Sequence, residues 1–401
     1  MAKKLQADEW LFAATAGLAL FGVVMVYSAS ADVAHAQQGD QYFYVKRQAI
    51  WTVAGLALML AASQTDYTIL KRRGVVFALL AATAAALCAV FAFSPTNGAR
   101  RWIKLPGASL QPSEFSKLAL AVFLAWLLER RAGDEGSIRR TLVPALGVTG
   151  LFVVLVAAEP DLGTAMMLGV ICLAMLYTAG ARLVHLGALA AVGVFGVVAM
   201  ILAAPWRVKR LWAFLDPWAD PQGTGYQVVQ SLIAVGSGGA NGLGFAEGRQ
   251  KMFFLPYAHS DYIFAVVGEE LGLVGSLTVL VVFGLFLWRG VRAALRAPDR
   301  FGMLLGMGIV AGIVAQALFN MSVVLSLVPS KGIPLPFISY GGSSMLLTLG
   351  AVGVLLNISQ QGTEQSAALH ARVHAEATER VAARVRERAP VAQEWRPEGR
   401  G

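Results

Sequence analysis

Charged residues are scarce in this chain of 401 residues. Asp, Glu, Lys and Arg make up 14% of it, whereas about 25% is usual for a soluble domain. Hydrophobic residues make up 57%, and the mean hydropathy is +0.61. Because the apolar residues fall in long runs, the composition excludes a soluble globular protein and indicates an all-α polytopic membrane protein.

Cysteine is scarcer still. Cys88 and Cys172 are the only two and both fall in apolar runs, which excludes a disulfide framework or a cysteine-ligated metal site. We interpret both as small buried hydrophobic residues. Nucleotide-binding signatures are also absent, because the glycine-rich segment 236–244 has neither the spacing of a dinucleotide fingerprint nor the Gly-Lys-Ser/Thr of a phosphate loop. That segment is open to two interpretations, an anion-binding nest or a flexible turn.

The net charge of +9 does not indicate a nucleic-acid partner. The basic residues gather in short segments between apolar runs and in the C-terminal part, as in the cytoplasmic loops of membrane proteins. Apolar runs long enough to cross about 30 Å of hydrocarbon occur ten times. The predicted spans are residues 10–29, 49–64, 73–93, 113–129, 142–158, 162–179, 183–204, 262–288, 301–326 and 338–358.

The first run follows Lys3 and Lys4 and is longer than a signal-peptide core, so we expect it to remain as the first span. Ten spans place both chain ends on one side, and the excess of Lys and Arg on that side predicts that both lie inside. A large extracytoplasmic loop, about 205–261, then joins the seventh and eighth spans. We divide the chain into a transmembrane domain, 1–359, and a cytoplasmic tail, 360–401, whose Arg, Glu and Ala predict a polar helix or a disordered segment.

Two outer segments, 97–114 and 205–261, carry basic residues against this bias. Their cations either bind an anionic ligand or are solvated by water and lipid phosphate. A charged side chain inside a span costs roughly 2.5–3.5 kcal/mol on insertion scales, so it usually lines a cavity or has a partner. Near the outer ends of the predicted spans such side chains form one layer: Glu114, Lys117, Glu159, Asp161, Asp261 and Lys331.

Local spacing adds detail to this layer. Glu114 and Lys117 are three residues apart, so they share a helix face and can pair. Pro112 suits the first turn of the same helix. Pro160 should end the fifth span, and Asp161 either caps the sixth or belongs to the site.

The eighth predicted span holds two more acids. Glu269 lies about 12 Å deeper than Asp261 along a helix, and Glu270 lies on the opposite face, so we interpret both glutamates as structural. The adjacency of His259, Ser260 and Asp261 is no evidence for a hydrolytic triad, because triads are assembled from distant positions. The residues thus predict a helical bundle with a polar, cationic and partly acidic cavity that opens outward. A ligand with a phosphate and a long apolar part would fit it, to be transformed, carried or held.

Four polar segments resemble the SEDS family of shape, elongation, division and sporulation proteins. They are NGARRWIKLPGASLQPSEFSKLAL, EPDLGTAMML, GYQVVQSLIAVGSGGANGLGFAEGRQKMFFLPYAHSDYIFAVVGEELGLVG and KGIPLPFISYGGSSMLLTLGAVGVLLNIS. The resemblance runs in order from about residue 10 to 358 and leaves out the tail. Within the family, GSGG, Gly268, Lys331 and Ser344 are more similar to the FtsW type than to the RodA type.

The resemblance implies a peptidoglycan glycosyltransferase. Such an enzyme polymerises lipid II, a disaccharide-pentapeptide on undecaprenyl pyrophosphate, at the outer face of the cytoplasmic membrane during cell division or elongation. The implied partners are a class B penicillin-binding protein transpeptidase and other divisome or elongasome proteins. No tightly bound cofactor is expected, although a divalent cation, Mg²⁺ or Mn²⁺, assists some members.

The same resemblance implies the site. Asp261, in the motif LPYAHSDYIF, becomes the catalytic carboxylate and general base. Cations that would stabilise the pyrophosphate leaving group are Arg100, Arg101, Lys104, Lys117, Arg210, Lys251 and Lys331. Further expected substrate contacts are Gln111, Ser113, Glu114, Glu159, Asp161, Gln250, His259, Ser260, Ser339, Tyr340 and Ser343.

One position departs from the family pattern. Tyr257 stands where the family commonly has glutamate, so no carboxylate role carries over to it. Two other functions stay open at this point: a lipid II flippase and a non-catalytic membrane scaffold. The charged layer lies near the outer mouth only, which favours chemistry at the surface over transit, and a scaffold would not need a buried aspartate facing arginines.

Overall fold

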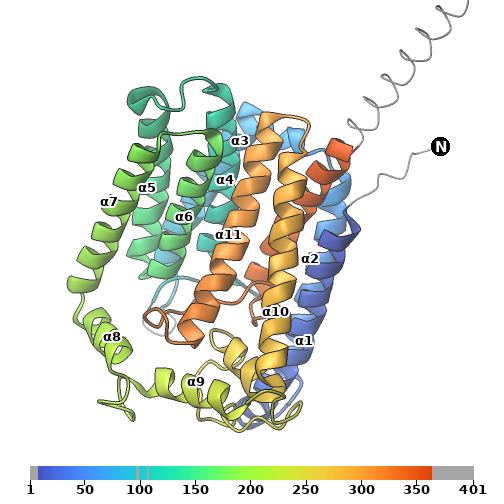
Figure 1. Cartoon of the computed structure of the whole chain (residues 1–401), viewed down its shortest axis with the longest axis vertical. Helices are drawn as coiled ribbons and strands as arrows, with labels where there is room; N and C mark the ends of the chain where they lie inside the picture. Colours follow the sequence, from blue (N-terminus) through green and yellow to red (C-terminus); the bar gives the residue numbers. More distant parts are fainter. Residues whose placement is uncertain (1–7, 96–98, 106–107, 364–401) are drawn as a thin grey trace, which may run out of the picture.

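The computed structural model describes residues 8–95, 99–105 and 108–363 as a bundle of long helices (Figure 1). The helices are α1 (Glu9–Gln38), α2 (Phe43–Gln64), α3 (Arg73–Ala89), α4 (Pro112–Arg130), α5 (Val143–Ala158), α6 (Leu162–Ala179), α7 (Leu183–Leu202), α8 (Pro205–Leu215), α9 (Tyr226–Ser237), α10 (Ile263–Leu295) and α11 (Arg300–Val324). A last helix, Gly342–Thr363, ends the described part, so the predicted tail lies almost wholly outside it.

Helix boundaries follow the local capping chemistry. Asp8 accepts a hydrogen bond from the backbone N–H of Leu11 at 3.0 Å, and α1 begins at the next residue. Asp161 caps α6 in the same way, as its sequence position predicted. Pro112 is the first residue of α4, where its missing N–H costs nothing.

Eight helices of the described part are long and apolar enough to cross a membrane: α1, α3 with its short extension, α5 with the turn before it, α6, α7, α10, α11 and Gly342–Thr363. Helices α2 and α4, of 22 and 19 residues, are less apolar: α2 has Lys46 and Arg47 near its start, and α4 has charged residues in its first and last turns. All ten coincide with predicted spans, and the class predicted from composition, an all-α polytopic membrane protein, is confirmed.

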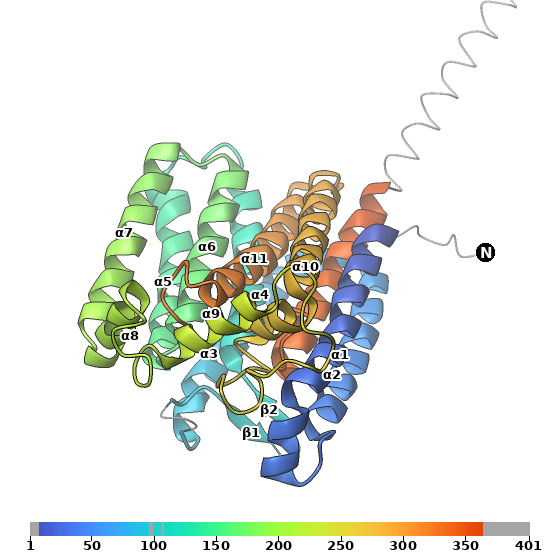
Figure 2. The ribbon, with the colours of Figure 1, turned by 60° about the horizontal axis from the view of Figure 1, so that its bottom comes forward.

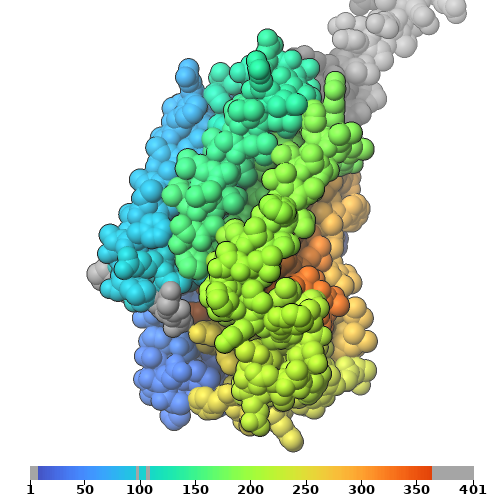
Figure 3. All heavy atoms as spheres, turned by 90° about the vertical axis from the view of Figure 1, so that its left-hand side faces the viewer, coloured from blue at the N-terminus to red at the C-terminus, as the bar shows by residue number. Residues whose placement is uncertain are grey.

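Helix α11 lies at the centre of the bundle. It packs against α4, α6 and α10, and 67% of its most apolar stretch is buried. Helix α7 is the opposite case, since none of its residues is buried and its neighbours are α6 and α8. Figure 3 looks onto that face, where α7 runs across the surface towards α8. The bundle therefore has a well-packed middle and a loosely attached edge.

The two ends of the bundle differ. Both described chain ends, the start of α1 and the end of the last helix, lie at the same end (Figure 1). Helices α8 and α9 and the hairpin of β1 (Ile103–Leu105) and β2 (Ala108–Leu110) lie at the other (Figure 2). The segment predicted as a plain outer loop, 205–261, thus contains two helices, and the all-α bundle carries one small sheet.

Two smaller expectations need correction or refinement. Cys172 is buried as predicted, but Cys88 is exposed on α3, because that helix turns much of its apolar surface outward. The glycine-rich segment packs against α10, where the backbone N–H groups of Leu243 and Gly244 donate to the carbonyls of Glu269 and Glu270, at 3.0 Å each. A Cβ on Gly238 would stand 1.9 Å from the carbonyl oxygen of Gly268, so only glycine lets the two backbones meet there.

Candidate active site at one end of the bundle

Asp261 lies in the connection between α9 and α10, two residues before α10 begins. Its side chain approaches the segment before the last helix so closely that a Cβ on Gly332 would stand 2.7 Å from Asp261 Oδ2. Its backbone carbonyl accepts a hydrogen bond of 2.8 Å from Asn320 Nδ2 of α11. The carboxylate therefore sits where two chain segments and the central helix meet.

These two segments are tied together on the other side as well. The backbone N–H of Tyr340 donates to the carbonyl of His259 at 3.0 Å, and Ser339 Oγ donates to the carbonyl of Ser260 at 2.6 Å. The His259 ring stacks on Tyr44 of α2, with ring centres 4.7 Å apart. Burial lowers the pKa of His259 to about 4, so at neutral pH its ring is an uncharged part of this packing.

A turn in the left-handed region starts the Asp261 segment. Tyr257, the position that departs from the family pattern, has φ 58°, and its carbonyl accepts from the N–H groups of Ser260 and Tyr262. Its side chain is half exposed. The backbone of Tyr257 thus forms the turn that presents Asp261.

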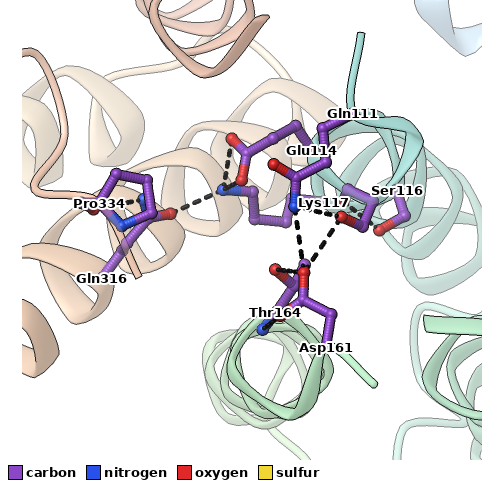
Figure 4. A network of polar contacts seen from close by, with 9 residues as sticks. Gln111, Glu114, Ser116, Lys117, Asp161, Thr164, Gln316 and Pro334 are labelled. Atoms are coloured by element: carbon purple, nitrogen blue, oxygen red, sulfur yellow. Dashed lines mark hydrogen bonds and ion pairs between the residues drawn. The ribbon is translucent and has the colours of Figure 1, made fainter. Parts of the chain in front are cut away.

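Helices α4 and α6 meet through Asp161. Its Oδ2 accepts from Gln111 Nε2 at 3.1 Å, from Ser113 Oγ at 3.3 Å and from Thr164 Oγ1 at 2.9 Å (Figure 4). The same carboxylate caps α6, which is one of the two roles left open for it. Three of the predicted site residues, Gln111, Ser113 and Asp161, thus form one cluster.

A second polar group joins α4 to α11. Lys117 Nζ lies 2.9–3.0 Å from both carboxylate oxygens of Glu114, which confirms the pairing predicted from their spacing. Lys117 also donates to Gln316 Oε1 at 2.6 Å, and Gln316 Nε2 donates to the carbonyl of Pro334 at 2.9 Å (Figure 4). This chain of contacts holds the segment before the last helix against the bundle.

Cations surround the two aspartates. Burial raises the pKa of Asp261 to about 6; Arg101 and Arg210 oppose this rise, while Asp161 adds to it. The pKa of Lys331 is lowered to about 8, mainly by burial and then by the charges of Arg207 and Arg210 of α8. Three predicted cations, Arg101, Arg210 and Lys331, therefore share one electrostatic environment with Asp261.

Glu159 has an unusual environment. It is fully buried after α5, and among the described residues neither carboxylate oxygen has a hydrogen-bond partner. Burial, with a smaller contribution from Asp161, raises its pKa to about 8, although Arg101 acts in the opposite direction. Arg101 itself donates to the carbonyls of Glu159 and Pro160, so it shapes this turn while contributing charge to the site.

Some predicted residues lie apart from Asp161 and Asp261 or have other contacts. Arg100 is exposed and donates to the carbonyl of Phe91 at 2.7 Å, and Lys104 is exposed on β1. Ser343 is buried in the first turns of the last helix. Lys251 is buried in an ion pair with Glu270, which leaves it no exposed charge for a ligand.

Glu269 and Glu270 bind the segment that precedes Asp261. Glu269 Oε1 accepts from the backbone N–H groups of Arg249 and Gln250 at 2.7 and 3.1 Å. Glu270 accepts from Ala246 N at 3.1 Å and from Ser28 Oγ of α1 at 2.6–2.7 Å. Both side chains thus hold chain segments together. Gln250 takes part through its backbone N–H, which donates to Glu269.

The sequence analysis missed several polar residues that organise the site. Gln48 of α2 donates to the carbonyl of Ser339 and is fully buried. Gln316 and Asn320 lie four residues apart on α11, and Arg207 lies on α8. The available signal was an uncharged amide inside an apolar span, which costs free energy unless the amide is hydrogen-bonded.

An apolar cavity lies beside the Lys117 group. Glu114, Lys117 and Gln316 contribute its polar wall. The rest of its lining comes from α4, α6, α11 and the C-terminal segment: Leu118, Ala121, Ile171, Gly308, Ile309, Gly312, Ile313, Pro336, Leu347, Thr348 and Ala351. A cationic polar layer next to an apolar cavity suits a ligand that is anionic at one end and apolar at the other.

Fold and site define a polytopic helical membrane protein with a carboxylate held among cations at one end of its bundle. A family model described as a cell cycle protein and named for FtsW, RodA and SpoVE matches residues 9–364, so the chain belongs to this family. The resemblance stated from the sequence motifs is thereby confirmed.

Individual relatives agree with this family. Stage V sporulation protein E of Bacillus subtilis is 42% identical over 359 residues, covering 89% of this chain and 98% of that protein. A probable peptidoglycan glycosyltransferase FtsW of Geobacter metallireducens is 41% identical over 347 residues, covering 85% and 92%.

Two solved structures are also similar. A chain from a peptidoglycan synthase complex, described as coordinating polymerization and crosslinking, matches with a TM-score of 0.72 and 29% identity, covering 89% of this chain and 99% of that one. The crystal structure of the rod shape determining protein RodA of Thermus thermophilus matches with a TM-score of 0.66 and 25% identity, covering 89% and 98%.

Proposed function

We propose that this chain is a peptidoglycan glycosyltransferase, which joins lipid II units into glycan strands at the outer face of the cytoplasmic membrane during cell division or elongation. The observation that carries the proposal is the partly buried Asp261 carboxylate among Arg101, Arg210 and Lys331. The relative from Geobacter metallireducens, a probable peptidoglycan glycosyltransferase, supports the activity.

Asp261 is the general base in this proposal. It takes the proton of the acceptor sugar hydroxyl while that oxygen attacks the anomeric carbon of the donor sugar. A new glycosidic bond forms, the bond from the anomeric carbon to the pyrophosphate oxygen breaks, and undecaprenyl pyrophosphate leaves with the bonding pair. A carboxyl pKa of about 6 suits this role, because the group is mostly ionised at neutral pH yet still basic enough to accept a proton.

The cations stabilise the leaving group. Negative charge grows on the pyrophosphate as its bond to the sugar breaks, and fixed positive charges that already point there lower the barrier. Arg210 and Lys331 meet this requirement from α8 and from the segment before the last helix. Arg101 contributes from the turn that it also holds together.

The topology in this proposal has ten spans with both chain ends inside. Residues 1–359 form the transmembrane domain and 360–401 a cytoplasmic tail, in the inner or cytoplasmic membrane. The segment 205–261, with α8 and α9, then lies outside and presents Asp261 to extracytoplasmic substrate. Both described chain ends lie at the end of the bundle opposite α8 and α9, in support of this arrangement.

The proposed partners are lipid II, a class B penicillin-binding protein transpeptidase and further divisome or elongasome proteins. The similar chain from a complex that coordinates polymerization and crosslinking supports a transpeptidase partner. A divalent cation fits less well, because His, Cys, Asp and Glu form no group of three or more in the described ranges that could hold a metal ion. We assign no step of the reaction to Mg²⁺ or Mn²⁺.

The test is polymerisation of labelled lipid II by the purified protein with its transpeptidase partner in detergent. We expect glycan strands from the wild type and none from Asp261→Ala or Asp261→Asn. Equal product from wild type and variants would remove the role of Asp261. No product under any condition, together with transfer of lipid II across liposomes, would establish a flippase instead, and neither activity would leave a scaffold.

A further inference from the structure

Asn320 is a polar residue near the C-terminal end of the largely buried helix α11. Its side chain is 1% exposed on α11, among apolar neighbours. Burying an amide without partners costs roughly 1–3 kcal/mol on scales derived from protein mutations. Asn320 meets this cost with two hydrogen bonds from one nitrogen: Nδ2 donates to the carbonyl of Asp261 at 2.8 Å and to the carbonyl of Ile333 at 2.7 Å.

The two acceptors belong to the two segments that form the site. Ile333 follows Lys331 by two residues, and Asp261 is the candidate base itself. One amide therefore fixes the base-bearing segment and the Lys331-bearing segment to a common point. Within the described ranges, Asn320 makes the only side-chain hydrogen bond to the backbone of Asp261.

The anchor is rigid on its other side. Helix α11 packs against α4, α6 and α10, so Asn320 cannot follow a loop that moves. The two segments also approach closely, since Asp261 Oδ2 lies against Gly332. A displacement of about 1 Å at such a site can cost on the order of 100-fold in rate.

The contact requires an amide. Both amide hydrogens point at carbonyl oxygens, and among the described residues Asn320 Oδ1 has no partner. A carboxylate of the same shape would place an anionic oxygen against two carbonyls and donate nothing. Aspartate at this position should therefore be as harmful as an apolar residue.

We propose that Asn320 is a positioning residue for glycosyl transfer, which holds Asp261 in register with the Lys331 segment through the two carbonyls of Asp261 and Ile333. This inference rests on the proposed function. Asn320 does not contact the reacting groups, so it acts through the placement of Asp261.

The experiment compares Asn320→Leu and Asn320→Asp with wild type in the lipid II polymerisation assay, using the full chain with its transpeptidase partner. Ser231→Ala is the matched control. Ser231 of α9 is fully buried, and its Oγ donates a hydrogen bond of 2.8 Å to the carbonyl of Val324 of α11, the helix that carries Asn320. Each protein is first checked by thermal unfolding in detergent. The readouts are kcat and the pH dependence of kcat/KM.

We expect both Asn320 variants to lose roughly 100-fold in kcat and to show an acid limb displaced from that of the wild type. Displacement follows because the carboxyl of Asp261 moves relative to the groups that set its ionisation, Arg101, Asp161, Arg210 and Ser260. Ser231→Ala should keep both readouts. A mere loss of folded protein lowers kcat but leaves the acid limb in place.

Three results separate the possibilities. Wild-type kcat in Asn320→Leu and Asn320→Asp would overturn the inference. So would a loss that matches the unfolded fraction with an unmoved acid limb. If the wild type itself makes no glycan, the proposed function fails. The two failures are distinct, because the inference about Asn320 is tested by the ratio of the variant's kcat to that of an active wild type.

Discussion

Lys251 Nζ lies 2.6 Å from Glu270 Oε1, and Ser28 Oγ of α1 bonds to both side chains. The lysine side chain is 3% exposed and the glutamate side chain is 0% exposed. This buried ion pair joins the segment before Asp261 to α10 and α1. From its sequence position Lys251 was expected to bind the ligand. In the structure it is a buried structural residue that pairs with Glu270.

Removing one partner of this pair should destabilise the protein strongly. Lys251→Met or Glu270→Gln leaves the other group buried without its counter-charge, which costs about 3–5 kcal/mol. The double variant removes both charges, so its unfolding midpoint in detergent should lie above that of the less stable single variant. Additive losses in the double variant would contradict the ion pair as the cause.

The close approach of the glycine-rich segment to α10 makes glycine necessary at Gly242. This residue has φ +80°, and a Cβ there would lie 2.1 Å from the carbonyl oxygen of Glu270. Gly242→Ala should therefore lose more than about 2 kcal/mol of unfolding free energy through strain and displacement. Gly236→Ala is the control, since Gly236 lies within α9 with nothing within 4 Å of its Cβ position, and alanine should be neutral or stabilising there. Equal unfolding midpoints for the two variants would be evidence against the close backbone approach.

Much of the bundle could be predicted because a membrane imposes a simple rule on the sequence. Each of ten apolar runs became a helix, and Asp161 and Pro112 marked helix starts correctly. Helices α8 and α9 were not predicted, because segment 205–261 was interpreted from its charged residues and not from its pattern of apolar residues. Helix α8 carries both tryptophans and arginines on its short length, which is a detectable amphipathic pattern.

The site was predictable only in part, for a geometric reason. The Glu114–Lys117 ion pair could be predicted from spacing along one helix, because residues three apart lie on the same helix face. Contacts between distant segments, such as that of Asn320 with Asp261, depend on how helices pack and leave no local pattern. The same limit applies to Lys251, whose partner Glu270 lies on α10, 19 residues further along the chain.

The pH dependence of kcat/KM should be bell-shaped. Asp261 must be deprotonated to act as a base, and its pKa is raised to about 6, so activity falls as the pH drops through about 6. Lys331 must be protonated to stabilise the pyrophosphate, and its pKa is lowered to about 8, so activity falls as the pH rises through about 8. Lys331→Arg should remove the alkaline limb, because arginine stays protonated. An alkaline limb that persists in this variant would show that another group titrates there.

Arg210 should link the two limbs of this profile. Its charge lowers the pKa of Asp261, where it opposes the effect of burial, and it lowers the pKa of Lys331 in the same direction as burial. Arg210→Gln should therefore raise both pKa values and move both limbs of the profile to higher pH, with a lower maximum because one cation near the leaving group is lost. The neighbouring Lys209→Gln removes the same charge from α8 and serves as the control, because Arg210 and not Lys209 is among the charges that shift the pKa values of Asp261 and Lys331. Limbs that move in opposite directions, or that move equally in both variants, would show that Arg210 does not face Asp261 and Lys331 together.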